Sequence, residues 1–232
     1  MDYQPAFATN TVDEALIQES QRAFMNRVYR WMFGALLVTG AVAMATATNL
    51  ALTQMVARNF LPLTIATLGL VLALSWAAPR MSGAVAAAMF LAYSVLNGLF
   101  FSVLFYVYPI GTIGQAFLMT AGVFGALSVY GTVTKKDLSA WRTFLFIGLV
   151  GIILASVVNI FARNDMADFV ISCAVIIVFA GLTAYDTQKL RQYHATHGYD
   201  SAMSFSIVGA LMLYLDFINL FLAILRLLGR RR

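Results

Sequence analysis

The sequence predicts an all-α membrane protein, a bundle of seven transmembrane helices. Of its 232 residues, 61% are hydrophobic and only 11% are charged, whereas an ordinary soluble domain has roughly 25% charged residues. Its uncharged stretches are repeatedly long enough for a helix of about 20 residues, the length that crosses a bilayer. Polarity does not alternate along these stretches, which excludes a membrane barrel and leaves helices.

Seven apolar stretches are candidate spans, and they follow one another too closely for a second domain to fit between them. They cover residues 32–50, 60–78, 83–108, 112–132, 142–162, 167–187 and 204–228. The uncharged stretch from Met81 to Thr134 is too long for one helix, and Pro109 with Gly111 predicts a break within it. Small residues inside the spans, such as Gly34, Gly40, Gly122 and Gly125, predict close helix packing. We divide the chain into a polar N-terminal segment, residues 1–25, and a single transmembrane bundle, residues 26–232.

The lysine and arginine residues lie mainly at the edges of the apolar stretches and indicate the orientation of the bundle. With seven spans, nine of them fall on the side of the N-terminus and six on the other side. Cytoplasmic loops carry an excess of these residues, so the count favours a cytoplasmic N-terminus. A re-entrant last segment would change the count to 13 against two. Residues 204–228 would nevertheless form a helix of about 37 Å, which exceeds the hydrocarbon core of about 30 Å and favours seven full spans.

Composition and motifs exclude several function classes. The net charge of +5 comes from loop residues, without the basic patch and exposed aromatic residues that are typical of nucleic-acid binding. The single cysteine, Cys173, lies in an apolar stretch and can form no intramolecular disulfide. The sequence contains no nucleophile elbow, no phosphate-binding glycine loop and no HExxH motif. We therefore expect neither an enzyme nor a bound cofactor.

Two aspartates inside apolar stretches are the candidate functional residues. Asp216 lies midway along the last stretch, with at least nine uncharged residues on each side, and Asp186 ends the sixth. A charge at the centre of a span costs about 2.5–3.5 kcal/mol on insertion scales, so such residues are functional candidates. Consecutive helices are usually neighbours, which would let the two carboxyls face each other. Carboxyls in contact would share a proton, and once ionised they would offer hard oxygen ligands suited to Ca²⁺.

Simpler roles stay open for both aspartates. Asp216 would merely lock the bundle if it paired with Arg80 or with a buried amide, for which Asn97, Asn159 and Asn219 are the candidates. Asp186 would be a solvated charge if it lay at a helix end near the membrane surface, because Lys189 follows it closely.

Four other polar residues receive structural interpretations. His194 and His197 are three residues apart in an expected polar loop, and we interpret them as solvated side chains, since two histidines without further ligands make a weak metal site. Asp165 and Asp168 lie where the sixth span begins, and we interpret them as helix-capping residues.

Three segments resemble the Bax inhibitor-1 family, also called the transmembrane Bax inhibitor motif proteins, in its bacterial branch. They are Tyr214-Leu-Asp-Phe-Ile-Asn-Leu-Phe-Leu with the following Ile224-Leu-Arg-Leu-Leu-Gly, then Tyr185-Asp-Thr-Gln-Lys, and Thr134-Lys-Lys-Asp-Leu-Ser. The likeness covers about residues 20–230. It implies a last helix at the centre of the bundle, wrapped by the other six, in the bacterial cytoplasmic (inner) membrane.

The resemblance also implies a pH-dependent leak of Ca²⁺ through the membrane. The aspartate pair of the family maps onto Asp186 and Asp216, which would sense pH, bind the ion and set whether the path is closed or open. A basic residue near the end of the second span latches one aspartate in some members. Here that stretch carries a single arginine, Arg80, which follows a proline and is the candidate latch or pairing residue.

A second hypothesis follows from the same resemblance. Bacterial relatives resemble modulators of a membrane-bound quality-control protease, a role that needs no ion flux. The polar N-terminal segment, residues 1–25, would provide the contact with such a protease because it lies outside the apolar stretches.

Overall fold

Seven helices of the computed structural model are long and apolar enough to cross a membrane. The structure describes residues 7–77, 80–197 and 203–230, and these residues contain no strand. The candidate spans are Leu16–Ala47, Phe60–Ala77, Gly83–Val107, Ile110–Val133, Leu138–Ala162, Asp165–Gln192 and Met203–Gly229. The prediction of an all-α, seven-span protein is confirmed. The first span begins earlier than predicted and the sixth continues further.

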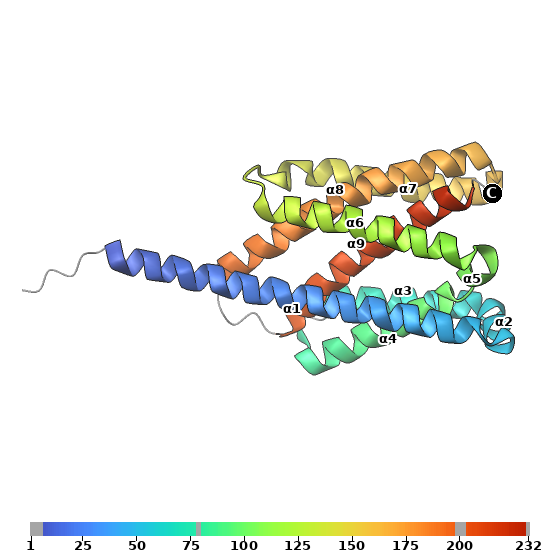
Figure 1. Cartoon of the computed structure of the whole chain (residues 1–232), viewed down its shortest axis with the longest axis horizontal. Helices are drawn as coiled ribbons and strands as arrows, with labels where there is room; N and C mark the ends of the chain where they lie inside the picture. Colours follow the sequence, from blue (N-terminus) through green and yellow to red (C-terminus); the bar gives the residue numbers. More distant parts are fainter. Residues whose placement is uncertain (1–6, 78–79, 198–202, 231–232) are drawn as a thin grey trace, which may run out of the picture.

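The helical elements follow the chain in a simple order (Figure 1). They are α1 (Phe7–Ala47), α2 (Leu50–Arg58), α3 (Phe60–Ala77), α4 (Gly83–Phe101), α5 (Leu104–Val107), α6 (Ile110–Val133), the 3-10 helix η2 (Leu138–Trp141), α7 (Arg142–Ala162), α8 (Asp165–His197) and α9 (Met203–Gly229). The histidines that were expected in a loop, His194 and His197, belong to the last turns of α8. Their side chains lie outside the part of the chain that the structure describes.

Short polar residues and proline set the boundaries between the helices. The side chain of Asn49 accepts hydrogen bonds from the N–H groups two and three residues later, at 3.0 and 3.2 Å, and so begins α2. Pro109 precedes α6, as predicted, because proline can begin a helix but not continue one. The side chain of Asn164 accepts from the N–H of Ala167 at 3.0 Å where α8 begins. Asn164, rather than Asp165 or Asp168, is therefore the residue that caps α8.

The last helix, α9, is the most buried of the candidate spans. In its most apolar 18-residue window 72% of the residues are buried, against at most 33% in the other spans. It contacts α1, α3, α4, α6 and α8, and Figure 1 shows it between α1 and α6. The side chains of Leu213, Tyr214 and Leu220 are fully buried. An inner helix of this kind faces protein rather than lipid, so a polar residue on it is shielded from the hydrocarbon.

The last helix also spans the molecule without a break. Its 27 residues correspond to about 40 Å at 1.5 Å per residue, and it ends at the opposite end of the bundle from its start (Figure 1). The structure thus has seven full spans rather than a re-entrant last segment. The N-terminal end of α1 and the C-terminal end of α9 lie at opposite ends of the bundle (Figure 1).

The first helix extends well beyond the bundle. Figure 1 shows the N-terminal part of α1 projecting past the other helices. Leu16 and Ile17 on this part are exposed, whereas Phe24 and Met25 are buried in the main core. The helix continues without interruption across residue 25, where the sequence division between segment and bundle was placed.

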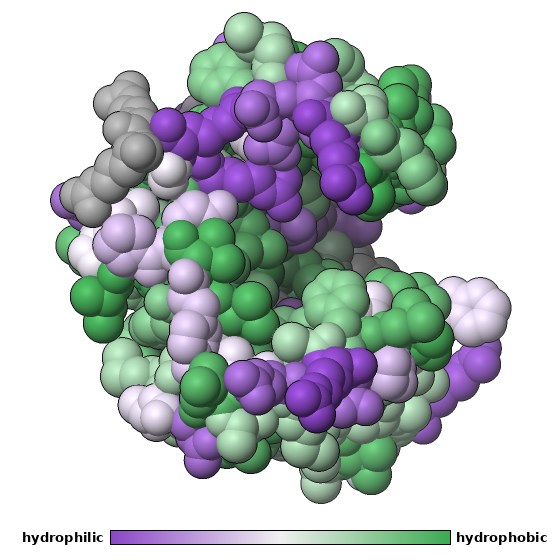
Figure 2. Space-filling model, turned by 90° about the vertical axis from the view of Figure 1, so that its right-hand side faces the viewer, coloured by the Kyte–Doolittle hydropathy of each residue, from purple (hydrophilic) through white to green (hydrophobic). Residues whose placement is uncertain are grey.

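The outer surface is apolar over much of its area. In the most apolar 18 residues of the peripheral helices α3 and α7, only 6% of the residues are buried. Trp76 on α3 and Phe161 on α7 are 90% and 83% exposed. Seen from the end where α9 finishes, hydrophilic residues form groups above and below a hollow, with apolar residues around them (Figure 2). Hydrocarbon is the environment that suits such apolar side chains.

Candidate functional site

The two aspartates singled out in the sequence lie on the two last helices, which pack against each other. Asp186 on α8 is 8% exposed and Asp216 on α9 is 3% exposed. Asp186 lies close enough to Asp216 for its charge to act on the second carboxyl. Asp186 is followed by more than two further turns of α8, so it does not sit at a helix end. Its burial argues against the solvated charge considered from the sequence.

The orientation of Asp216 follows from the contacts of Tyr214, two residues earlier. The Tyr214 hydroxyl is 2.8 Å from Oγ1 of Thr39 on α1, and the Tyr214 ring stands edge-on to those of Phe90 and Tyr93 on α4, at 5.7 and 5.8 Å. Two residues correspond to about 200° around a helix. Asp216 therefore faces away from α1 and α4, on the side where α8 packs.

Within the described residues, one oxygen of Asp216 lacks the hydrogen-bond partner that a purely structural role would require. Its Oδ2 atom is buried and has no hydrogen-bond partner among the described residues. The side-chain amides of Asn97 and Asn219 donate to carbonyls one turn earlier in their own helices, at 2.9 and 2.8 Å. Asn159 accepts from the backbone N–H of Asn164 at 3.1 Å. The three amides considered as locking partners thus bond to backbone groups elsewhere.

The candidate latch, Arg80, is exposed between α3 and α4. Within the described ranges, the ion pairs are Arg226 with Asp168 at 3.8 Å and Arg230 with Asp165 at 3.9 Å. These pairs join the end of α9 to the start of α8. The structure therefore brings Asp186 and Asp216 together without forming an ion pair between Arg80 and either of them.

A different basic residue lies near Asp186. Lys189 follows it one turn later on α8. The Lys189 ammonium lies 5.7 Å from the centre of the Tyr185 ring. In the sequence, the closeness of Lys189 indicated that Asp186 would lie at an exposed helix end. In the structure Asp186 is buried while Lys189 is exposed, so the two side chains lie in different surroundings.

Gln188 ties the loop between α6 and η2 to the site, a role that the sequence did not reveal. Its side-chain oxygen accepts from the N–H of Leu138 at 2.9 Å, and its side-chain nitrogen donates to the carbonyl of Lys136 at 2.8 Å. Between them, Asp137 accepts from the N–H of Ser139 at 2.9 Å, and this hydrogen bond lowers the pKa of Asp137 from its usual value of 3.8. Gln188, two residues after Asp186, thus joins two of the three segments that carry the family resemblance.

A glycine sets the approach of α6 to α8 beside the site. A Cβ atom on Gly131 would overlap the carbonyl oxygen of Ala184, two residues before Asp186. The glycines named from the sequence behave differently, because Gly34, Gly40, Gly122 and Gly125 have no atom within 4 Å of an added Cβ. Their prediction as close-packing residues was wrong. Glycines recur throughout these spans, and only the tertiary structure distinguishes those that face another helix.

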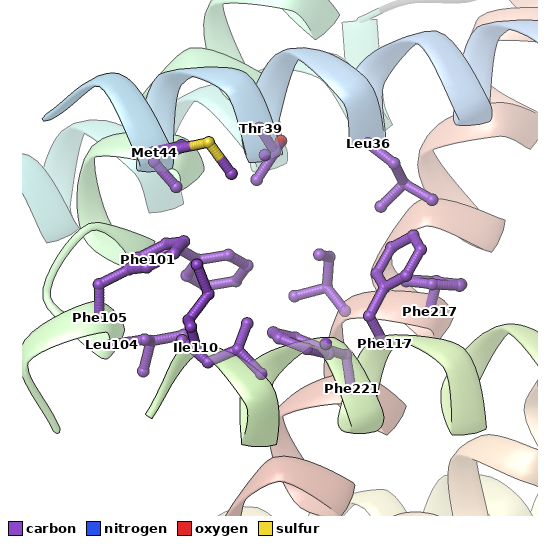
Figure 3. Close-up of a pocket in the computed structure, with 15 residues that line it drawn as sticks. Leu36, Thr39, Met44, Phe101, Leu104, Phe105, Ile110, Phe117, Phe217 and Phe221 are labelled. Carbon is purple, nitrogen blue, oxygen red and sulfur yellow. The ribbon is translucent and has the colours of Figure 1, made fainter. Parts of the chain in front are cut away.

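An apolar cavity of about 290 Å³ lies between α1, α5, α6 and α9, away from the aspartates. Figure 3 shows Phe117, Phe217 and Phe221 around it. Thr39 also lines it, and its hydroxyl donates to the carbonyl of Ser94 and lies 2.8 Å from the Tyr214 hydroxyl. Asp186 and Asp216 are not among the lining residues. Such a cavity offers almost no oxygen ligands and is not suited to a cation.

The carboxyl pair by itself does not complete a cation site. Among the described residues, no three His, Cys, Asp or Glu side chains are grouped as metal ligands. Ca²⁺ takes six to eight oxygen ligands, which include carbonyls and water. Thr187, next to Asp186 along α8, has a buried hydroxyl without a hydrogen-bond partner in the described residues. A cation held by the two carboxyls would need further oxygen ligands from carbonyls or water.

Comparison with known proteins covers nearly the whole chain. The model of the family described as inhibitor of apoptosis-promoting Bax1 matches residues 21–232. The inner membrane protein YbhL of Escherichia coli strain K12 is 43% identical over 217 residues, which cover 91% of this chain and 93% of that protein. An uncharacterised protein of Deinococcus radiodurans is 46% identical over 208 residues, which cover 89% and 90% of the two chains. One of Borreliella burgdorferi is 39% identical over 229 residues, 97% of each.

Proposed function

Because the chain belongs to the Bax inhibitor-1 family, we propose that it is a pH-dependent calcium leak of the bacterial inner membrane, gated by protonation of Asp186 and Asp216. The observation that best supports this proposal is the burial of two carboxyls on adjoining spans, where one oxygen of Asp216 has no hydrogen-bond partner among the described residues. Intramembrane carboxylates of this kind mark ion and proton pathways.

The sign of the pH response follows from the charges of the pair. At higher pH both carboxyls ionise, repel each other and attract a divalent cation. At lower pH a proton shared between them removes the repulsion and weakens the attraction for Ca²⁺. Protonation therefore favours the closed state, and flux rises as pH rises. Asp216 is only 3% exposed, which supports assigning this conformation to the closed state.

Calcium flux into proteoliposomes tests the mechanism. Asparagine resembles a protonated aspartate in shape and cannot ionise, so D186N combined with D216N should give low flux that no longer depends on pH. Asp165→Asn is the matched control, because Asp165 lies on the same helix with its side chain fully exposed. The control should keep the wild-type profile. Unchanged flux and pH dependence in the double variant would show the mechanism to be wrong.

The projection of α1 beyond the bundle favours a second function, regulation of a membrane-bound quality-control protease. Deletion of residues 1–20 should abolish this regulation and leave Ca²⁺ flux intact, because the buried part of α1 begins near Phe24. The stability of the membrane substrates of the protease is the readout. If the deletion leaves their degradation unchanged, the projecting helix is not the contact.

A further inference from the structure

A polar cleft lies between α1 and the ends of α6 and α8, at the end of the bundle where α1 projects. Its volume is about 520 Å³. It is lined by Gln18, Gln21, Arg22, Met25, Asn26, Tyr29, Thr132, Val133 and Arg191. From its chemistry and position we propose that this cleft binds the phosphate headgroup of an anionic phospholipid from the adjacent leaflet.

The lining favours an anion. Arg22 and Arg191 bring two guanidinium groups to the cleft, and none of the described residues that line it is acidic. A guanidinium offers a planar fork of donors that matches phosphate oxygens, and side-chain amides add further donors. Arg191 donates a hydrogen bond to the carbonyl of Thr132. This bond holds the Arg191 side chain across the end of α6, so one of the two charges is fixed in place before any ligand arrives.

The position of the cleft favours a lipid over a soluble anion or an acidic peptide. On α6 the side chains of Val129 and Val133 are 63% and 72% exposed, which marks a surface that suits hydrocarbon. The chain then continues with Thr134, Lys135 and Lys136, which suit the aqueous side. The cleft therefore lies where the hydrocarbon ends and the phosphate groups of a bilayer begin.

An apolar cavity that could accept an acyl chain lies further along α1 from the cleft. The apolar cavity of Figure 3 lies between the same two helices, α1 and α6, with Leu36 on its wall. From Met25 in the cleft to Leu36 is about 16 Å along the helix axis, about half of a hydrocarbon core of 30 Å. A phospholipid whose headgroup occupies the cleft can thus direct an acyl chain towards an apolar cavity.

Native mass spectrometry of the full-length protein, titrated with phosphatidylglycerol, tests the proposal. R22Q should weaken the apparent lipid affinity about fivefold, since one basic residue near a membrane surface contributes about 1 kcal/mol, and R22Q with R191Q should weaken it further. Asn26→Asp, which adds a negative charge to the cleft, should weaken it without touching Arg191. R27Q with R30Q is the matched control, because both arginines are exposed on the same part of α1 and neither lines the cleft.

Each outcome decides for or against the lipid. The proposal is supported if the cleft variants lose affinity for phosphatidylglycerol while R27Q with R30Q keeps it. The weaker binding of zwitterionic phosphatidylethanolamine should stay unchanged in all variants. Equal loss of lipid affinity in R27Q with R30Q would contradict a specific site and would indicate general attraction by the basic end of α1. Displacement of the lipid by soluble glycerol phosphate at similar concentration would assign the cleft to a free anion. Because Arg191 also bonds to Thr132, wild-type affinity in both R22Q and Asn26→Asp is the result that overturns it.

Discussion

Gln188 joins segments of the chain that lie about 50 residues apart. It bonds to the N–H of Leu138 and to the carbonyl of Lys136 and is itself buried, so the loop after α6 is fixed against α8. Asp186 occupies the same stretch of helix. The loop is therefore held beside the stretch of α8 that carries Asp186, and two segments that are separate in the sequence become one connected unit.

Replacing Gln188 by alanine should destabilise the protein by about 1–3 kcal/mol, because the buried N–H of Leu138 then lacks a partner. Unfolding of the purified variant in detergent, followed by its helical signal, measures the loss. Gln188→Glu keeps an acceptor for Leu138 but replaces the donor to Lys136, so an intermediate loss is expected. Wild-type stability of Gln188→Ala would show that the loop does not depend on this contact.

Asp137 provides an internal test of where pH is sensed. The hydrogen bond from Ser139 lowers the pKa of Asp137 from its usual value of 3.8. The contribution of Asp137 to folding is therefore present above that usual value and is lost as pH falls through the lower folded value. Asp137 thus stays ionised at physiological pH. Asp137→Asn should leave the pH profile of calcium flux unchanged, and a shifted profile would place the sensor in the loop.

The helices α6 and α8 approach each other closely where Gly131 meets the Ala184 carbonyl. A side chain at this point would overlap backbone, which cannot move aside as a flexible side chain can. The contact lies half a turn from Asp186 on α8. The spacing of α6 and α8 is therefore fixed by a backbone contact near Asp186.

Gly131→Ala should destabilise the protein by about 1–3 kcal/mol through overpacking, and it should alter calcium flux because α6 is pushed away from α8. Gly125→Ala is the matched control on the same helix, since nothing lies within 4 Å of its added Cβ. That control should be neutral or stabilising by about 0.5–1 kcal/mol, because glycine weakens a helix interior. Equal effects of the two changes would contradict the close approach. Unfolding in detergent measures both.

Across the whole molecule, the seven spans place the loop after α6 and the turn between α7 and α8 at opposite ends. The positive charges at the first end favour the cytoplasm. The C-terminal arginines at the other end engage acidic groups, since Arg226 and Arg230 pair with Asp168 and Asp165. Pairing offsets part of their charge and gives a structural reason for basic residues on the less basic side.

Cysteine labelling tests this topology. In a Cys173→Ala background, a membrane-impermeant maleimide should label Arg163→Cys in intact spheroplasts and Lys135→Cys only after the membrane is opened. Both positions are exposed, so accessibility depends on the side of the membrane alone. Labelling of both cysteines from the same side would contradict seven full spans, and the reverse pattern would place the N-terminus outside.

The number and order of the spans, the break at Pro109 and the two aspartates were predictable from the sequence. Hydrocarbon imposes a minimum length and a composition on every crossing helix, and a carboxyl within such a helix is conspicuous. These constraints act on each stretch by itself, so they can be recognised without knowing which helices are neighbours.

Only the tertiary structure decided that α9 is the most buried span, that Gln188 holds the loop and that Gly131, rather than Gly122 or Gly125, marks a close contact. It also placed Arg80 on the surface and Lys189 beside Asp186. Each of these features depends on which face of a helix meets another helix. In spans that are apolar on all sides, the sequence pattern does not distinguish the face towards lipid from the face towards protein.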